Sequence, residues 1–311
     1  MSVSSANNIV FCINSNFSKY LYVQMSSILR HSKENIHFYI LYSSIDDKAK
    51  ENIINILNSY NHAKFDIDFI FVDIKKLLES KFDNFRLRSW FGSYDIYNRL
   101  FLNEILKEKS IKTVISMDAD MIILYDLSEL FDLYRATKTI RGLPEKNLCF
   151  KQYNIYLNAG LLILDLDFLN QINFTQKAVH MINNEKNKLL YPEQDIINFV
   201  IDDELKQTMS ERFNEMDSNK NFIEEKTVVL HYVGRNKPWR ISKSWNHAKI
   251  LWFKEKYIAN KMLKNIIVDE RKVDIYFKFL EIIFYPFFFV INSIRYLQST
   301  IKKFVKKFRN N

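Results

Sequence analysis

Short apolar runs alternate with segments of helical periodicity along most of the chain, and this alternation limits the fold more than any other feature. Apolar runs of roughly four to eight residues are typical of buried strands, whereas apolar residues spaced three and four apart indicate helices. The strand-like runs lie at 8–13, 36–42, 65–72, 112–117, 161–166 and 227–230, and the helical segments at 20–30, 46–59 and 94–106. Strands separated by helices predict a three-layer α/β fold with a mainly parallel sheet.

The charge divides the sequence into two parts. The 311 residues carry a formal net charge of +9, and residues 254–311 contain 13 Lys and Arg against 5 Asp and Glu, a net of +8. The rest of the chain is therefore close to neutral. We expect an α/β body at 1–253 and a basic, aromatic helical tail at 254–311, and we expect the two parts to have different partners.

The tail has the pattern of a helix that lies on a membrane surface. Its uncharged stretch, 282–294, has 13 residues and contains Pro286, whereas a membrane-spanning helix needs about 20 apolar residues. Apolar residues then recur at helical spacing among lysines and arginines as far as Phe308. Such a helix is expected to bind an anionic membrane surface. The alternative is a terminal helix that packs on the body; nucleic acid is not expected as a partner, because the segment is too apolar.

The N-terminus and the cysteines narrow the class of protein. Residues 1–8 are polar and lack the basic and apolar regions of a secretory signal, so none is expected. The two cysteines, Cys12 and Cys149, are too few for a disulfide framework. Each has an apolar neighbour, which predicts buried structural thiols rather than a redox pair.

Two aspartates directly after a predicted strand are the first candidates for chemistry. Asp118 and Asp120 follow the run 112–117, and further apolar residues follow them. Ligands of open α/β sheets bind beyond the carboxyl ends of the strands. Two carboxylates at close range oppose each other's ionisation unless a cation joins them, and hard oxygen ligands suit Mg²⁺ or Mn²⁺. The alternative is an acidic turn in which Asp120 caps the next segment.

Two further segments carry candidate residues. In the first, Asn158 and Gly160 precede a strand, and the glycine permits a close approach of the backbone or a positive φ. In the second, His231 follows an apolar strand, Gly234 allows a tight turn, and Lys237 is placed to reach a phosphate. Alone, a histidine after a strand is more often structural, and a lone lysine is more often solvated.

Taken in order, these segments resemble glycosyltransferase family 8, which includes retaining lipopolysaccharide galactosyl- and glucosyltransferases. The resemblance covers residues 8–252 and rests on an ordered set of motifs rather than on the Asp-X-Asp pair alone. The segments that carry it are NIVFCINSNFSKYL, SYDIYNRLFL, VISMDADMIIL, YLNAGLLILDL, YPEQDIIN and HYVGRNKPW. The resemblance implies a GT-A-type fold, in which helices flank a mixed, mostly parallel sheet, and an α-linked product.

The family pattern can be transferred onto the matching positions. It implies that Asp118, Asp120 and His231 bind Mn²⁺ (or Mg²⁺), and that Gly234 and Lys237 hold the phosphates of a UDP-sugar. The remaining positions would contact the base and ribose (Asn14, Asn16 and Tyr97) or surround the donor sugar (Arg99, Ala119, Asn158, Ala159, Glu193 and Gln194). The sequence departs from the family at two positions. Asn14 stands where an acidic residue is common, which bears on the recognition of uracil. Glu193 stands where aspartate is usual and keeps the charge on a longer side chain, which bears on the choice between galactose and glucose.

The reaction has two candidate routes. A double displacement needs a nucleophile on the β face of the sugar. The resemblance places Gln194 there, an amide and a poor nucleophile, whereas Asp195 is chemically better but can equally be an acid that favours the N-terminus of a helix. The prediction therefore leans towards a same-face reaction, with Gln194, Asp195 and Arg99 as the candidate catalytic residues.

The expected acceptor is a lipid-linked oligosaccharide of the lipopolysaccharide or lipooligosaccharide type. The basic tail suits a peripheral enzyme on the inner face of the cytoplasmic membrane. Trp90, Phe91 and residues 141–156 are the candidate acceptor contacts. Two other functions remain open: a non-catalytic, membrane-associated nucleotide-sugar-binding protein, and a metal-dependent nucleotidyl- or phosphotransferase. No feature of the sequence predicts an oligomeric state.

Overall fold

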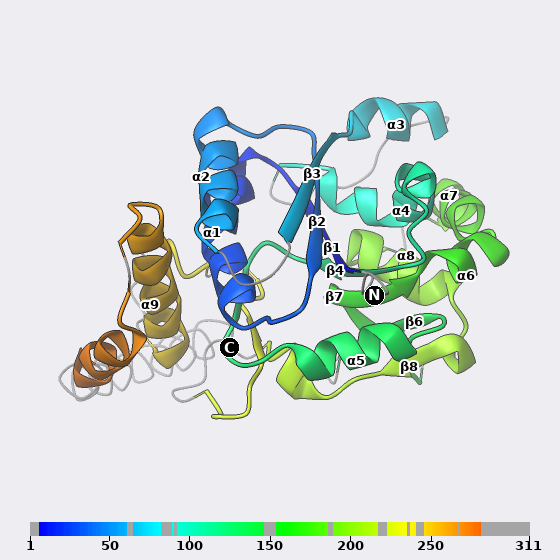
Figure 1. The fold of residues 1–311 in the computed structure, drawn as a ribbon. Coiled ribbons are helices and arrows are strands. Elements are labelled where there is room, and N and C mark those ends of the chain that lie inside the picture. Colours follow the sequence, from blue (N-terminus) through cyan, green and yellow to red (C-terminus); the bar gives the residue numbers. More distant parts are fainter. Residues whose placement is uncertain are drawn as a thin grey trace, which may run out of the picture.

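The computed structural model describes most of the body and the start of the tail. The described residues are 6–60, 65–81, 89, 92–145, 154–185, 189–216, 223–234, 237–240, 246–266 and 268–280. Helices lie on both faces of a central sheet, as Figure 1 shows. The predicted tail helix beyond residue 280, and with it the predicted contact with a membrane, lies outside these residues.

The central sheet has seven strands in the order β3-β2-β1-β4-β7-β6-β8. The first four are parallel, β7 is antiparallel to both of its neighbours, and β6 and β8 are parallel to each other. The mixed, mostly parallel sheet that the sequence predicts is thus confirmed. The strands are β1 (Asn7–Ile13), β2 (Ile36–Tyr42), β3 (Phe65–Phe71), β4 (Thr113–Met117), β6 (Ile140–Pro144), β7 (Leu157–Asp165) and β8 (Lys206–Thr208).

Two hydrophobic clusters join the helices to the sheet. One packs α1, α2, α5 and α9 on one face, and the other packs α3, α4, α6, α7 and α8 on the opposite face. The central strands β4 and β7 are buried along their whole length because both faces are covered. The helices are α1 (Ser15–Arg30), α2 (Asp47–Asn58), α3 (Ile74–Lys81), α4 (Leu102–Ile105), α5 (Ser128–Ala136), α6 (Leu166–Gln171), α7 (Phe174–Glu185), α8 (Pro192–Val200) and α9 (His247–Met262).

A second, two-stranded sheet joins segments that are far apart in the sequence. Strand β5 (Met121–Ile123) pairs antiparallel with β9 (Val229–His231), and Met121 lies opposite His231. The backbone N–H of Tyr232 donates to the carbonyl of Asp120 at 2.9 Å. This small sheet therefore fixes the position of Asp120 relative to that of His231.

The predicted elements and the observed ones differ mainly at their ends. The predicted helix at 46–59 is confirmed with Asp46 as its N-cap, whose carboxylate accepts from the N–H of Ala49 at 2.7 Å. Helix α1 starts at Ser15, earlier than predicted, because the side chain of Asn14 caps it. The predicted helix at 94–106 is a 3₁₀ helix (Asp95–Phe101) followed by the short α4.

Helix α9 crosses the predicted boundary at residues 253 and 254. It packs against α1, where the hydroxyl of Tyr22 donates to Asn260 at 2.8 Å and Arg30 pairs with the buried Glu255. The packed part of the chain therefore extends beyond residue 253. Within the described ranges, no helix is long and apolar enough to cross a membrane.

Replacing Arg30 with methionine is expected to lower the free energy of unfolding by about 3–5 kcal/mol. Arg30 pairs with Glu255 and also with Glu270, at 2.9 Å. Burial raises the pKa of Glu255 and Arg30 opposes this effect, so removing the guanidinium leaves a buried carboxylate without compensation. Urea denaturation measures the loss. The double variant Arg30→Met/Glu255→Met is the control and should recover most of it; equal losses in both variants would contradict the pairing argument.

Candidate active site

A cavity of about 300 Å³ opens at the carboxyl edge of the central sheet. Parallel strands deliver their last residues to one edge, and an antiparallel strand delivers its first residues there. Asn14 follows β1, residues 118–120 follow β4, Glu145 follows β6, and residues 158–160 begin β7. The other polar residues that line the cavity include Ser93, Asp95, Glu193, Gln194, His231 and Lys237. The cavity thus lies where the sequence predicts a ligand.

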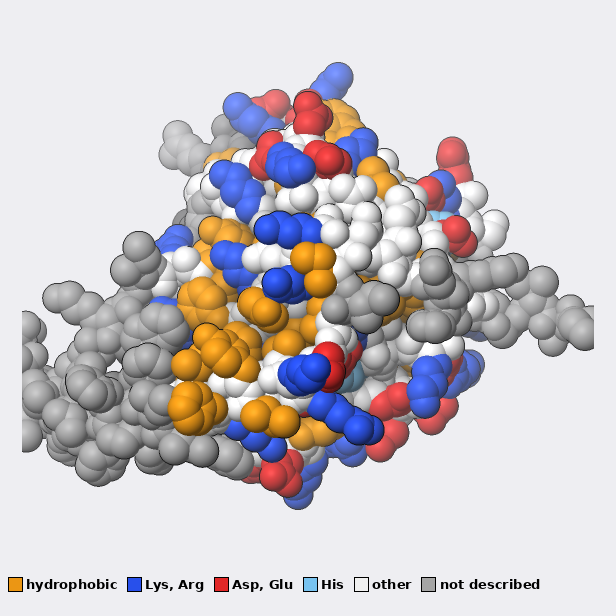
Figure 2. All heavy atoms as spheres, turned by 60° about the vertical axis from the view of Figure 1, so that its left-hand side comes forward, with side chains coloured by type: hydrophobic (Ala, Val, Ile, Leu, Met, Phe, Trp, Pro, Cys, Tyr) orange, Lys and Arg blue, Asp and Glu red, His pale blue; other side chains and the backbone are white. Residues whose placement is uncertain are grey.

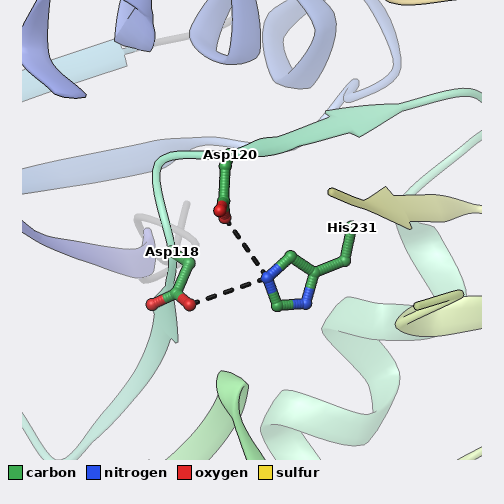
Figure 3. A group of neighbouring side chains, drawn as sticks. All are labelled: Asp118, Asp120 and His231. Carbon is green, nitrogen blue, oxygen red and sulfur yellow. Dashed lines mark ion pairs between the residues drawn. The ribbon is translucent and has the colours of Figure 1, made fainter. Parts of the chain in front are cut away.

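Asp118, Asp120 and His231 converge in this cavity, as Figure 3 shows. Nε2 of His231 lies 3.2 Å from Oδ1 of Asp120 and 3.6 Å from Oδ2 of Asp118. Asp118 comes from the end of β4, Asp120 from the residue before β5, and His231 from the end of β9. The three side chains that the sequence proposes as ligands are therefore brought together.

Gly160 makes room for this arrangement. A Cβ atom at this position would overlap Cε1 of His231 and lie 2.9 Å from its Nδ1. Its φ is not positive, so of the two reasons that the sequence offers for a glycine, the close approach is the one that applies. The carbonyl of Gly160 also accepts from the N–H of Asp118 at 2.7 Å, which holds the first aspartate beside β7.

Arg99, His231 and Lys237 lie close to the two aspartates and offset the cost of burying their carboxylates. Burial alone would raise the pKa of Asp118, but Arg99, at 2.7 Å, and His231 outweigh it and hold this pKa at about 2. Burial would lower the pKa of His231, but Asp120 and Asp118 raise it to about 9. Lys237 pairs with Oδ2 of Asp120. The cavity thus holds a carboxylate at Asp118 with a lowered pKa beside a second carboxyl group, Asp120, that pairs with a lysine.

These residues fit a divalent cation. One atom from each of Asp118, Asp120 and His231 lies within 4.8 Å of the others. Oδ1 of Asp120 is buried without a hydrogen-bond partner among the described residues, and a buried oxygen of this kind needs a partner. Carboxylate oxygens suit Mg²⁺ and Mn²⁺, and an imidazole nitrogen suits first-row transition metals such as Mn²⁺.

The predicted phosphate-binding residues flank this group. Gly234 lines the cavity and has φ +81°, which permits the tight turn that the sequence predicts. The Nζ atom of Lys237 donates to the carbonyl of Tyr232 at 2.8 Å, and the side chain is buried. Lys237 is therefore not the solvated surface lysine that the sequence leaves open as an alternative.

Arg99 connects the aspartates to the predicted sugar side of the cavity. Its guanidinium donates to Glu193 at 3.0 Å and, through Nε, to Ser116 at 3.0 Å. Burial raises the pKa of Glu193 to about 7, against the opposing effect of Arg99. Gln194 accepts from the N–H of Ala159 at 2.8 Å. The residues that the family pattern places around the sugar are therefore neighbours: Ala119, Asn158, Ala159, Glu193 and Gln194 line the cavity, with Arg99 behind them.

Asp195, proposed as an alternative nucleophile, lies apart from this group. Its carboxylate accepts from the hydroxyl of Tyr156 and from the N–H groups of Leu190 and Tyr191, at 2.6 and 2.9 Å. It is fully buried and is not one of the described residues that line the cavity. Its contacts match the structural role of an acid at the N-terminus of α8.

The residues proposed for the base and ribose are only partly assembled. Asn14 lines the cavity, but its Oδ1 caps α1 by accepting from the N–H groups of Asn16 and Phe17. Asn16 is exposed and Tyr97 is buried in the hydrophobic core; neither lines the cavity as described. Of the proposed acceptor contacts, Trp90, Phe91 and residues 146–153 lie outside the described residues.

The sequence analysis does not single out four polar residues of the site: Ser93 and Asp95, which line the cavity, and Glu145 and Asn214. Glu145 lies within the candidate acceptor segment 141–156 but is not distinguished there. Glu145 lines the cavity and accepts hydrogen bonds from Asn158 at 2.7 Å and Gln194 at 3.0 Å. Asn214 is fully buried and contacts His231. Glu145 follows a strand of five residues, and Asn214 follows a 3₁₀ turn of three. The first segment, IRGLP, is not a continuous apolar run, and the second is a single turn, so no local signal marks Glu145 or Asn214.

Comparisons with known proteins agree with this geometry. A putative glycosyltransferase of Haemophilus influenzae is 28% identical over 287 residues, which cover 86% of this chain and 81% of the relative. A lipopolysaccharide 1,2-glucosyltransferase of Escherichia coli is 26% identical, over an alignment that covers 80% of this chain and 77% of the relative. The crystal structure of the galactosyltransferase LgtC with donor and acceptor sugar analogs superimposes with a TM-score of 0.64 at 20% identity, over 85% of this chain and 99% of that one.

The family assignment rests on the match to a whole-family model. The model described as glycosyl transferase family 8 matches residues 8–243. This range contains the central sheet, the small β5–β9 sheet and the lining residues of the cavity named above. With the predicted GT-A-type fold confirmed by the structural neighbours, the chain is a glycosyltransferase that belongs to glycosyl transferase family 8.

Proposed function

We propose that this glycosyltransferase transfers galactose or glucose from a UDP-sugar to an acceptor of the lipopolysaccharide or lipooligosaccharide type, with retention and an α linkage, and requires Mn²⁺ or Mg²⁺. The observation that carries the proposal is the convergence of Asp118, Asp120 and His231 in a cavity that also contains Lys237. Similarity to a lipopolysaccharide 1,2-glucosyltransferase of Escherichia coli and a lipopolysaccharide 1,3-galactosyltransferase of Salmonella typhimurium supports the choice of substrates.

The residues around the cavity suit a nucleoside diphosphate as leaving group. A divalent cation bound at Asp118, Asp120 and His231 would act as a Lewis acid on the diphosphate. Lys237 lies beside Asp120 with a buried ammonium group. The positive charge is thus placed where negative charge develops as the sugar leaves, and it has more effect in a buried site than in water.

The sugar side of the cavity supports a same-face reaction. Gln194 faces the predicted sugar position with an amide, and Asp195 is engaged by three hydrogen bonds elsewhere. A double displacement would need a carboxylate nucleophile there. In the same-face route the departing phosphate takes the proton of the incoming hydroxyl, and the amide of Gln194, which lines the cavity, would stabilise the positive charge that develops on the sugar.

The peripheral position at the cytoplasmic face of the membrane is also a proposal. Figure 2, which turns the α9 side of Figure 1 forward, shows hydrophobic side chains grouped with Lys and Arg around them. Tyr257 of α9 and Ile275, Tyr276 and Phe279 beyond it are exposed. Aromatic and basic side chains together favour an anionic interface.

A chain truncated after Tyr285 should sediment less with anionic vesicles than the full chain does; equal sedimentation would contradict the role of the tail.

Thermal unfolding with UDP and Mn²⁺ tests the donor site directly. A ligand at about 100 times its dissociation constant stabilises the folded state by about 2.7 kcal/mol. We expect UDP to raise the melting temperature in the presence of Mn²⁺ but not with EDTA, because the cation links the diphosphate to the aspartates. If UDP raised the melting temperature equally with EDTA, the proposed metal requirement would be wrong. If saturating UDP did not raise the melting temperature at all, the proposed UDP-sugar donor would be wrong.

A further inference from the structure

A continuous chain of buried and partly buried hydrogen bonds runs from His231 to Gln194. Asn214 contacts Nδ1 of His231 at 2.9 Å through Oδ1 and donates to Oδ1 of Asn158 at 3.0 Å through Nδ2. Asn158 donates in turn to Glu145 at 2.7 Å, and Glu145 also accepts from Gln194 at 3.0 Å. We refer to these five side chains as the amide relay.

Two backbone groups set the direction of every hydrogen bond in the amide relay. A backbone N–H can only donate, so the N–H of Gly160, 2.9 Å from Oδ1 of Asn158, identifies that atom as the oxygen. Nδ2 of Asn158 then faces the carboxylate of Glu145. At the other end, the N–H of Ala159 identifies Oε1 of Gln194 in the same way, so that Nε2 faces Glu145.

The direction at Asn158 decides the orientation of Asn214. Oδ1 of Asn158 accepts from Gly160, so the atom of Asn214 that faces it must be the donor Nδ2. A flipped Asn214 would bring two amide oxygens together. The oxygen of Asn214 therefore faces His231, and because an amide oxygen can only accept, Nδ1 of His231 carries a hydrogen atom and donates it.

We infer that Asn214 is a positioning residue: it holds Nδ1 of His231 and so directs Nε2 at a cation between Asp118 and Asp120, which on binding displaces the proton that the two aspartates otherwise favour on Nε2. Neutral imidazole exists in two tautomers, and the hydrogen bond at one nitrogen decides which nitrogen binds a metal. Here Nδ1 is engaged with Asn214, while Nε2 points at both aspartates. The inference rests on the metal site of the proposed function and assigns the residue that orients its histidine.

The same relay ties the metal ligand to the sugar side. Asn158 and Gln194 are both buried, and both donate to Oε1 of Glu145. Three side chains, Asn214, Asn158 and Glu145, separate His231 from Gln194 in this hydrogen-bonded chain. A change in the orientation of His231 is therefore expected to change the hydrogen bonds of Gln194. Asn214 is fully buried, so its amide has no solvent to turn towards and the relay has one stable polarity.

Titration of the protein with Mn²⁺ alone, with free Mn²⁺ counted by electron paramagnetic resonance, tests the inference. Asn214→Leu keeps a similar volume but offers no acceptor to Nδ1, and we expect it to weaken Mn²⁺ binding by about 10- to 100-fold. Asn214→Asp keeps an acceptor at the same position and is expected to bind more tightly than Asn214→Leu. Asn103→Leu is the matched control: Asn103 is a buried asparagine with two side-chain partners, Asn170 and Thr175, and is not one of the described residues that line the cavity.

The outcomes separate the inference from the proposed function. Wild-type affinity in Asn214→Leu, or an equal loss in Asn103→Leu, overturns the role of Asn214 and leaves the metal site standing. Absence of Mn²⁺ binding in the wild type overturns both. If Asn214→Leu does not fold, ¹⁵N NMR of the wild type at saturating Mg²⁺ decides, with His231 assigned among the 6 histidines from the spectrum of His231→Gln. A neutral imidazole with its hydrogen on Nδ1 supports the inference; an imidazolium, or a neutral imidazole with its hydrogen on Nε2, overturns it.

Discussion

Replacing Asp120 with asparagine is expected to reduce sugar transfer by about 1,000-fold or more, which corresponds to about 4 kcal/mol of transition-state stabilisation. Asp120 contributes one oxygen that faces His231 and another that pairs with Lys237. The amide has nearly the same shape but no charge, so the variant retains the fold while it weakens the cation site and releases Lys237. Product formation from UDP-galactose and UDP-glucose, measured at several Mn²⁺ concentrations, gives the size of the effect.

Asp203→Asn is a suitable control for this experiment. Asp203 also pairs with a buried lysine, Lys206, at 2.7 Å, and it is not one of the described residues that line the cavity. This variant is expected to lose some stability but to keep its activity. If Asp120→Asn turned over at the wild-type rate, the metal-dependent mechanism would be wrong; if neither the wild type nor the variants transferred sugar while all bound UDP, a nucleotide-sugar-binding protein would be the better description.

Replacing Gly160 with alanine is expected to weaken Mn²⁺ binding by about 100-fold or more, although no ligand atom is removed. The new methyl group would occupy the space of Cε1 of His231. The imidazole cannot move aside freely, because Asn214 holds its Nδ1 at 2.9 Å. The histidine must therefore leave its position between Asp118 and Asp120. The titration with Mn²⁺ measures the loss, and the UDP-dependent rise of the melting temperature should fall with it.

Gly142→Ala separates this effect from general overpacking. A Cβ at Gly142 would lie 2.7 Å from Cδ2 of Leu162 and 3.3 Å from Cβ of Leu157, in the hydrophobic interior next to β7. Overpacking of this kind costs about 1–3 kcal/mol, so this variant should melt earlier but bind Mn²⁺ normally. Equal Mn²⁺ affinities in the two alanine variants would show that Gly160 has no special relation to the site.

The sequence predicted the parts of the site that follow long apolar strands. Asp118 and Asp120 come after a run that is recognisable by itself. At Gly160 the residue type left a close approach and a positive φ open, and the structure shows that the close approach applies. The ordered motifs then identified His231 and Lys237 as their partners. What brings these segments together is the β5–β9 pair, and each of its strands has only three residues. The apolar run at 227–230 indicates β9, but neither this run nor the residues after Asp120 show that the two strands pair. The motif order could therefore predict the contact, but the local sequence could not.

Other features of the site depend on contacts that a linear pattern does not contain. Asp195 has the chemistry of a nucleophile, but Tyr156 and two backbone N–H groups engage its carboxylate. Glu145 and Asn214 belong to the site only because β6 and a short turn end at the same cavity. For these residues the side-chain type leaves several roles open, and the partner across the cavity decides between them.

The join between β5 and β9 also bears on when the enzyme becomes competent during synthesis. Asp120 and Lys237, which pair in the folded protein, are 117 positions apart in the chain. Contacts at such separations form late, because the intervening chain must be ordered first. A nascent chain that ends before His231 can build most of the parallel strands but lacks the third ligand. Under the proposed function, capture of a nucleotide sugar should begin only after nearly the whole body has left the ribosome. Mn²⁺-dependent binding of UDP would then be a measure of complete folding.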